Sequence, residues 1–188
     1  PQKAYSDAMR AVLPDDAITV CDVTQLAFYM RLGFPVYTPR SQIFSGYQDS
    51  LGFGFATALG AKVAHPDKAV VCVTGDGGFL FTMPEIATAV KHDIPLITVL
   101  FNDGAFGNVR RIQKQHFGER YIGSDLTNPD FMKLADSFGI AGFRAFSPDE
   151  LGTTLAKALV CGGPALIEVP VGPMPAWQPF IPRTRARP

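Results

Sequence analysis

The chain has 188 residues, enough for one domain with a sizeable hydrophobic core. Hydrophobic residues make up 47% of it and charged residues only 18%, and its 17 basic and 17 acidic side chains give a formal net charge of zero. This balance offers no electrostatic attraction for nucleic acid or an anionic membrane, so we expect neither as a partner.

The cysteines and the apolar runs bear on where the protein works. Cys21, Cys72 and Cys161 are far apart and form no C-x-x-C pair, which argues against a disulfide framework or a zinc site. We therefore expect a reducing, intracellular setting, and take it to be the cytoplasm. No apolar run approaches the roughly 18 residues of a membrane span, and no signal-peptide pattern opens the chain. Because the chain begins with Pro1 rather than Met, we expect it to be a fragment or trimmed domain of a longer protein.

Short apolar runs rich in β-branched residues alternate with helical patterns along the chain. The apolar runs are continuous rather than alternating, which is typical of strands covered on both faces. The pattern predicts an α/β fold with a doubly wound, mainly parallel six-stranded sheet and helices on both faces. In chain order we expect a helix at 3–13, a strand at 17–23, a helix at 24–32, a weaker strand at 40–46, a helix at 51–64, a strand at 69–75, a helix at 84–92, a strand at 95–102, a helix at 131–138, a strand at 141–146, a helix at 149–161 and a strand at 165–171.

The end of the chain differs from the rest in composition. Residues 173–188 are rich in proline and show no periodicity, so we expect a domain at 1–172 followed by a Pro-rich tail that docks on it or is disordered.

Polar, turn-forming residues follow three of the expected strands. They are "CDVTQ" at 21–25, "TGDGG" at 74–78 and "FNDGAFG" at 101–107. In a doubly wound sheet, ligands bind outside the carboxyl ends of the strands near a topological switch point. These three strand ends should therefore converge on one site.

The "GDGG" stretch places a carboxylate where a phosphate-binding loop would be expected. Glycines let backbone amides approach a phosphate closely, but Asp76 would repel it by about 4 kcal/mol for unit charges 4 Å apart at an effective dielectric near 20. A cation between the two turns this repulsion into attraction. Mg²⁺ prefers oxygen ligands shared between protein, phosphate and water. The oxygen ligands from the protein would come from Asp76, from Asp103 or Asn102, and from a carbonyl group of the turn that follows.

Two other interpretations of these residues remain open. A glycine-rich loop after a strand is also typical of nicotinamide dinucleotide sites, with Asp103 as the ribose-binding acid. Against this, Leu80 occupies the third glycine position and Asp76 would face the pyrophosphate. Asp-Gly and Asn-Asp-Gly are each common in simple tight turns. The combination of both motifs at the ends of two successive apolar strands is more specific than either alone.

The stretch from Val71 to Gly107 resembles the diphosphate-binding motif of thiamine diphosphate enzymes, in which GDG is followed by an Asn pair or a variant of it. Nearly the whole chain is similar to the C-terminal, diphosphate-binding domain of the acetolactate synthase, pyruvate decarboxylase and benzoylformate decarboxylase group. Within this group it most resembles the acetolactate synthase-like proteins. The supporting segments are "PDDAITVCDVTQ", "SGYQDSLGFGFATALGAKVAHPDKAVVCVTGDGGFLFTMPEIATAV" and "PLITVLFNDGAFGNVRRIQ".

The resemblance implies a metal site. Asp76 matches the first metal ligand, and the backbone carbonyl of Ala105 matches the third. Asp103 stands where the family usually has asparagine, so it is expected to be the second side-chain ligand, with Asn102 replacing it if the register slips by one. The change from Asn to Asp adds a negative charge that would alter metal affinity or preference.

The resemblance also implies a set of cofactor contacts. Thr24 stands where glycine is frequent and Leu26 where histidine is frequent, so this segment departs from the family pattern at two positions. Leu51 matches the bulky apolar residue that holds the cofactor in its V conformation, although an ordinary core leucine at a helix start would look the same. The residues expected to bind cofactor are Val23, Thr24, Gln25, Leu51, Gly75, Asp76, Gly77, Gly78, Asp103, Ala105, Phe106 and Gly107.

The function implied is that of the diphosphate- and Mg²⁺-binding domain of a carboligase or decarboxylase, a transferase or lyase that acts on a small 2-oxo acid. No catalytic side chain is expected in this chain. The family activates the cofactor with a glutamate on a pyrimidine-binding domain, usually from a second subunit of a homodimer or homotetramer. The chain alone is therefore expected to be inactive. The resemblance leaves open whether a middle domain of the longer protein binds FAD.

Two further functions remain open beside this one. The first is the small subunit of a two-subunit decarboxylase such as sulfopyruvate decarboxylase. The second is a noncatalytic interaction domain that retains the fold.

Overall fold

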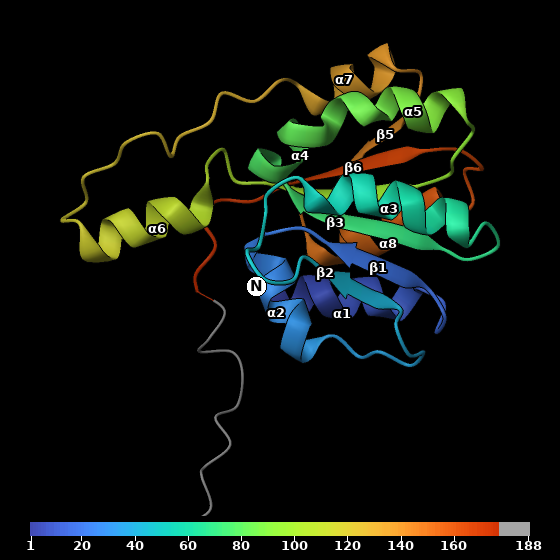
Figure 1. Cartoon of the computed structure of the whole chain (residues 1–188), viewed down its shortest axis with the longest axis horizontal. Helices are drawn as coiled ribbons and strands as arrows, with labels where there is room; N and C mark the ends of the chain where they lie inside the picture. The colour runs from blue at the N-terminus through green and yellow to red at the C-terminus, as the bar shows by residue number, and fades with distance from the viewer. Residues whose placement is uncertain (177–188) are drawn as a thin grey trace, which may run out of the picture.

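The computed structural model describes residues 1–176, which form one central sheet with helices on both sides (Figure 1). Every expected strand is present, including the weaker candidate at 40–46. The elements in chain order are α1 Gln2–Val12, β1 Ile18–Cys21, α2 Gln25–Gly33, β2 Gln42–Phe44, α3 Phe53–Ala64, β3 Val70–Gly75, α4 Asp76–Thr82, the 3-10 turn Met83–Glu85, α5 Ile86–Lys91, β4 Ile97–Asn102, α6 Gly107–His116, α7 Phe131–Ser137, β5 Ala141–Arg144, α8 Pro148–Leu159 and β6 Ala165–Pro170.

The six strands pair in the order β2-β1-β3-β4-β6-β5, and every pair is parallel. The four residues of β1 are all buried, as are the first five of β3 and of β4. This burial explains why the strands are continuously apolar in sequence, since both of their faces are covered. The predicted doubly wound fold is confirmed, and the sheet is entirely parallel.

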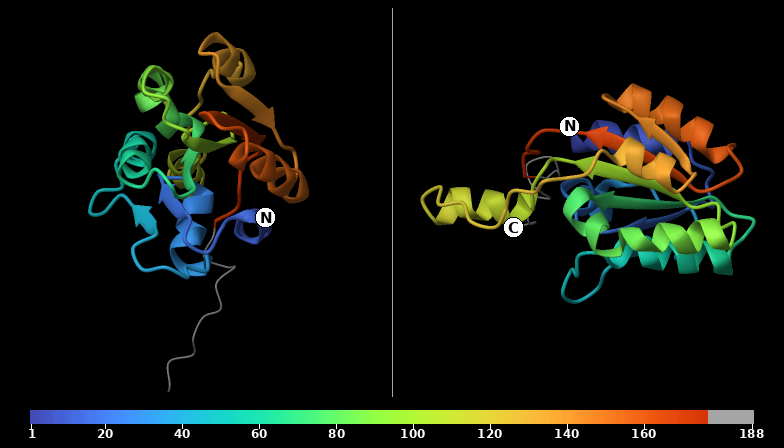
Figure 2. Two further views of the ribbon diagram at one scale, coloured as in Figure 1. Left: turned by 90° about the vertical axis from the view of Figure 1, so that its right-hand side faces the viewer. Right: turned by 90° about the horizontal axis from the view of Figure 1, so that it is seen from above.

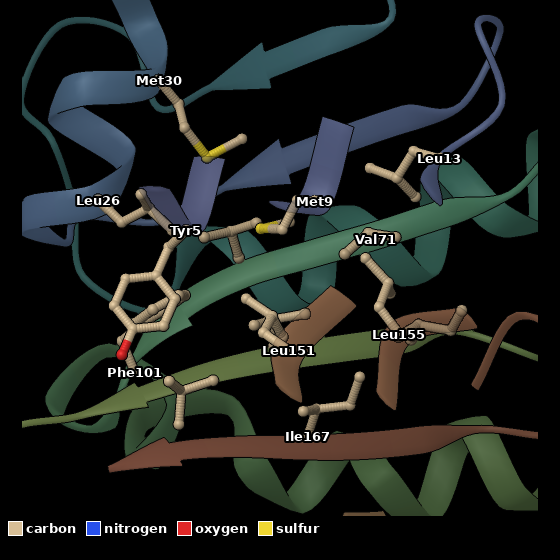
Figure 3. Close-up of a cluster of buried hydrophobic side chains, with 14 of the residues drawn as sticks. Tyr5, Met9, Leu13, Leu26, Met30, Val71, Phe101, Leu151, Leu155 and Ile167 are labelled. Atoms are coloured by element: carbon tan, nitrogen blue, oxygen red, sulfur yellow. The ribbon is translucent and has the colours of Figure 1, made fainter. Parts of the chain in front are cut away.

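Two hydrophobic cores lie on opposite faces of the sheet. Helices α1, α2 and α8 cover one face, and α3, α4, α5 and α7 cover the other (Figures 1 and 2). On the first face Met9, Met30 and Leu151 reach toward the strands in the cluster that Figure 3 shows. Tyr5 packs edge-on against Phe101 there, with 5.4 Å between ring centroids. This contact anchors the carboxyl end of β4, where polar residues begin.

The segment after β3 differs from the prediction. We expected a loop at 75–78 and a helix at 84–92, whereas α4 begins directly at Asp76 and a 3-10 turn separates it from α5. Two glycines lower the intrinsic helix propensity of α4. Its fully buried Phe79 offsets that cost by packing edge-on against Phe55 at 5.3 Å between centroids. Tertiary packing, rather than helix propensity, therefore stabilises α4.

Helix α6 was not among the predicted helices, and the residues at 101–107 were expected to form a turn after the strand. Gly107 is instead the first residue of α6, which projects beyond the carboxyl edge of the sheet (Figures 1 and 2) and has no buried residue. Its two large apolar side chains, Val109 and Ile112, are both exposed, so burial within this domain does not stabilise the helix.

The first residues of the predicted Pro-rich tail lie against the domain. Met174 packs on the first core, and Gln2 donates a hydrogen bond from Nε2 to the Pro175 carbonyl at 2.6 Å. The rest of the tail, 177–188, lies outside the described residues. Within 1–176, none of the helices has the length and apolarity needed to cross a membrane.

Candidate functional site

A cavity of about 360 Å³ opens at the carboxyl ends of β1, β3 and β4. From β1 the chain winds first to β2 on one side and later to β3 on the other, so β1 and β3 form the topological switch point. All the residues expected to bind cofactor line this one cavity: Val23, Thr24, Gln25, Leu51, Gly75, Asp76, Gly77, Gly78, Asp103, Ala105, Phe106 and Gly107.

The charges around the cavity are of one sign. Among the described residues that line it, none is lysine or arginine, whereas Asp49, Asp76 and Asp103 are present. Asp49 is paired with Arg31, which lowers the pKa of the Asp49 carboxyl through hydrogen bonding and charge. Asp76 is only 2% exposed. An anionic ligand in this cavity therefore meets carboxylates and no basic side chain among the described residues that line it, whereas Arg110, Arg111 and Lys114 line a neighbouring cavity that shares Asp103 and Ala105.

One oxygen of the Asp76 carboxylate is held by two donors. The Gly104 amide donates to Asp76 Oδ2 at 2.9 Å, and the Asn128 side-chain amide donates to the same oxygen at 2.6 Å. Within residues 1–176 no hydrogen bond reaches Asp76 Oδ1. The carboxylate is thus held through one of its oxygens at the wall of the cavity that Asp76 lines.

Asp103 lies beside Asp76 and shares its environment. Burial, and then the charge of Asp76, raise the pKa of Asp103 to about 6. Its Oδ1 accepts a hydrogen bond from the Ala105 amide at 3.3 Å. At Gly107 an added Cβ would stand 2.2 Å from Asp103 Oδ2, so any larger residue there would displace the Asp103 carboxylate.

Asn102, the alternative to Asp103, is engaged elsewhere. Its Nδ2 donates to Glu168 at 2.8 Å, and its Oδ1 accepts from the Gly104 amide at 3.2 Å and from Asn128 at 2.9 Å. Asn102 is not among the residues that line the cavity, whereas Asp103 is.

The turn after β4 is braced by a distant segment. The Phe106 amide donates to the Ser124 carbonyl at 2.8 Å, and the Leu126 amide donates to the Gly104 carbonyl at 2.9 Å. These bonds form an antiparallel bridge between Ala105 and Asp125. No donor among residues 1–176 binds the Ala105 carbonyl, which remains available to a ligand.

Asp22 connects three elements beside the cavity, which are β1, β3 and α3. It is 2% exposed and accepts hydrogen bonds from the amides of Gly52 at 3.1 Å and Gly54 at 3.2 Å, from the amide of Val23 at 2.7 Å and from the Thr74 hydroxyl at 3.4 Å. Burial raises the pKa of its carboxyl group, and these hydrogen bonds oppose the rise. Asp22 thereby ties the end of β1 to the start of α3 and to β3.

The departures from the family pattern near β1 have structural explanations. Thr24 is the N-cap of α2, and its hydroxyl accepts a hydrogen bond from the Leu26 amide at 3.1 Å. Leu26 is fully buried in the first core rather than facing the cavity. Leu51 is 38% exposed and stands in the turn before α3, which begins two residues later than the expected helix.

Sequence reasoning missed several residues of the site. Asn128 contacts Asp76 from an irregular segment before α7, and nothing in its spacing signals the contact. Asp22 belonged to a quoted motif but was not singled out. The cavity lining also includes Phe28, Gln48, Asp49, Phe101, Asn108, Val109, Val171 and Met174.

Comparison with known proteins bears directly on this cavity. Residues 22–169 match the family described as "Thiamine pyrophosphate enzyme, C-terminal TPP binding domain". The chain belongs to this family.

Named relatives of the chain are larger proteins. It is 38% identical over 182 residues to the probable acetolactate synthase large subunit of Methanococcus aeolicus, covering 94% of this chain and 30% of that protein. It is 37% identical over 188 residues to the corresponding Methanocaldococcus jannaschii protein, covering 97% of this chain and 32% of that protein. The domain thus spans about a third of the length of these relatives.

A solved structure gives the same fold. The Rhodococcus jostii RHA1 thiamine diphosphate-dependent 4-hydroxybenzoylformate decarboxylase superposes with a TM-score of 0.83 at 29% identity, over 91% of this chain and 32% of that one. The chain is therefore a thiamine diphosphate-binding domain of this C-terminal family, similar to that of the named acetolactate synthase subunits, and the predicted resemblance is confirmed.

The donor set at the base of the cavity suits a hard divalent cation. Two carboxylates, Asp76 and Asp103, and the carbonyl of Ala105 are all oxygen donors, and all three residues line the same cavity. Such oxygen ligands, completed by phosphate and water, are those that Mg²⁺ prefers.

Proposed function

We propose that this domain holds the diphosphate of thiamine diphosphate through Mg²⁺, within a carboligase or decarboxylase that acts on 2-oxo acids. One observation carries the proposal: the cavity at the switch point is lined by carboxylates and by no described lysine or arginine. A cation would supply the opposite charge beside these carboxylates, because like charges at such distances repel by several kcal/mol.

In this proposal Asp76, Asp103 and the Ala105 carbonyl bind the metal, and backbone amides of Gly75, Gly77 and Gly78 approach the diphosphate. Asp103 is preferred over Asn102 because the Asn102 Oδ1 already accepts two hydrogen bonds and its Nδ2 donates to Glu168. Phe106 and Gly107 shape the wall between these groups. An added Cβ at Gly77 would stand 2.6 Å from the Phe106 ring, so the close approach there requires glycine.

The remaining cavity residues orient the rest of the cofactor. Val23, Thr24 and Gln25 line its other side, and the partly exposed Leu51 would offer an apolar surface to the rings of the cofactor. When bound, thiamine diphosphate supplies the nucleophilic carbon and the electron sink for 2-oxo acid chemistry. No side chain of this domain is proposed to transfer a proton in that reaction.

The active site is proposed to need a pyrimidine-binding domain, contributed by a second subunit of a homodimer or homotetramer. The relatives are about three times as long as this chain, which supports a domain of a larger enzyme over a separate small subunit. Their names support an acetolactate synthase-like carboligation of a small 2-oxo acid, in the cytoplasm.

The metal assignment is tested by calorimetric titration of thiamine diphosphate into the full-length protein that carries this domain. Binding should require Mg²⁺, and Asp76→Ala should abolish it. Asp136→Ala, an exposed change on α7, serves as the matched control and should bind as the wild type does. Unchanged affinity in Asp76→Ala would overturn the assignment. Assaying the same protein for decarboxylation of pyruvate and benzoylformate tests the proposed reaction.

A further inference from the structure

A chain of polar side chains runs from a half-buried ion pair to the proposed metal ligand. Arg144 on β5 pairs with Glu168 on β6 at 2.7 Å, and Glu168 is only 4% exposed. Glu168 accepts a hydrogen bond from Asn102 at 2.8 Å, and Asn102 accepts one from Asn128 at 2.9 Å. Asn128 then donates to Asp76 at 2.6 Å. The four contacts link β5, β6 and β4 with the segment before α7 and the start of α4.

Each hydrogen bond in this series of side chains fixes the direction of the next hydrogen bond. An ionised carboxylate only accepts, so Glu168 requires Asn102 to turn its Nδ2 toward it. Asn102 then presents its Oδ1 on the opposite side, which only a donor can satisfy. The Gly104 amide donates to this oxygen at 3.2 Å, and Asn128 Nδ2 also donates to it while reaching Asp76 Oδ2. The reverse orientation of the Asn128 amide would set its oxygen against two acceptor oxygens.

These hydrogen bonds restrict the orientation of the Asp76 carboxylate. Asn128 and the Gly104 amide both hold Oδ2, and no described residue donates to Oδ1. Without Asn128, the carboxylate retains one donor and gains rotational freedom about its last bond. Groups that orient metal ligands in this way typically change metal affinity by 10-fold to 100-fold when removed.

We propose that Asn128 is a positioning residue of the metal site, and that Glu168 acts on that site through Asn102 and Asn128. This inference rests on the proposed function, since it assumes that Asp76 binds the cation. Asn128 has no part in either hydrophobic core, and its neighbour Thr127 is exposed. Its hydrogen bonds thus serve the two strand-end residues rather than the packing of the domain.

The test measures metal affinity directly rather than activity. The full-length protein is titrated with Mn²⁺ in the presence of thiamine diphosphate, and free Mn²⁺ is followed by electron paramagnetic resonance. Asn128→Ala should weaken Mn²⁺ binding about tenfold, and Glu168→Gln about threefold, because a neutral amide lets Asn102 turn either way. Thr127→Ala, on the same segment, is the matched control and should leave the affinity unchanged.

Combining the two changes distinguishes a relay from two separate effects. If Glu168 acts through Asn128, the double variant should bind Mn²⁺ no more weakly than Asn128→Ala alone. Additive losses would overturn the relay, and an Asn128→Ala affinity equal to that of Thr127→Ala would overturn the positioning role. If Asn128→Ala does not fold, Asn128→Ser replaces it with the same expectation.

The same titration separates this inference from the proposed function. If Asp76→Ala binds Mn²⁺ as the wild type does, the metal assignment itself is wrong. If Asp76→Ala abolishes binding while Asn128→Ala and Thr127→Ala behave alike, the metal assignment stands and only the positioning role fails.

Discussion

Replacing Asp22 with alanine should loosen the side of the cavity formed by β1 and α3. The carboxylate is the acceptor for two fully buried amides, those of Gly52 and Gly54, and for the partly buried amide of Val23. Thr74 depends on it less, because its hydroxyl also contacts the Gly75 carbonyl at 3.1 Å. The change therefore leaves two buried donors without partners.

The magnitude follows from these two donors. Each buried amide left unpaired costs about 1–3 kcal/mol, which gives roughly 2–6 kcal/mol for the pair. Burial of the Asp22 carboxylate itself costs free energy, which is why its pKa is raised. Removing the carboxylate therefore offsets part of the loss from the unpaired amides. We expect a net local loss of about 2–4 kcal/mol. Asp22→Asn keeps one oxygen but turns its amide toward a donor, so it should lose about half as much.

Hydrogen exchange of the full-length protein measures this loss where it occurs. A loss of about 2 kcal/mol corresponds to roughly 30-fold faster exchange of the amides in 52–54, because these open locally. Exchange in α8, on the other face of the sheet, should change little. The reasoning is refuted if exchange at 52–54 stays within about threefold of wild type, or if Asn and Ala at position 22 behave alike.

Two further predictions concern the proposed cofactor contacts. Asp103→Asn restores the family's usual residue and should keep Mg²⁺-dependent thiamine diphosphate binding, whereas Asp103→Ala should lose it in calorimetry; equal loss in both would show that the negative charge itself is needed. Leu51→Ala should leave the thermal unfolding midpoint nearly unchanged, because the side chain is 38% exposed, yet weaken thiamine diphosphate binding about tenfold by fluorescence titration, as expected for a lost apolar contact. A lower midpoint with unchanged binding would make Leu51 a core residue instead.

The geometry of the carboxyl edge explains why so compact a site could be anticipated. In a parallel sheet the strand ends meet along one edge, so the polar residues after β1, β3 and β4 had to lie together once the strands were assigned. Gly75 pairs with Phe101 and Cys21 with Val73, which places the three polar turns side by side. The glycines at 77 and 107 are required by close contacts with Phe106 and Asp103.

Other parts of the site depend on contacts between segments far apart in sequence. Asn128 reaches Asp76 only because the segment at 124–126 pairs with the backbone at 104–106. Likewise, the choice between Asn102 and Asp103 depends on Glu168, which lies on a strand added later in the chain. Neither contact leaves a local pattern that periodicity or spacing could reveal.

The sequence by itself determined the class of fold, the strands and the end of the sheet at which a ligand would bind. It did so because buried parallel strands must be continuously apolar and because polar turns interrupt that apolarity only where strands end. It also determined that a carboxylate, Asp76, stands where an anion would otherwise be held.

Only the tertiary structure decided how that carboxylate is oriented. The start of α4 at Asp76 is set by the burial of Phe79, not by helix propensity, since two glycines follow the aspartate. The direction of the Asp76 oxygens is set by the hydrogen bonds that run from Glu168 through Asn102 and Asn128. Hydrogen-bond direction is a property of groups in space, and the order of residues along the chain does not encode it locally.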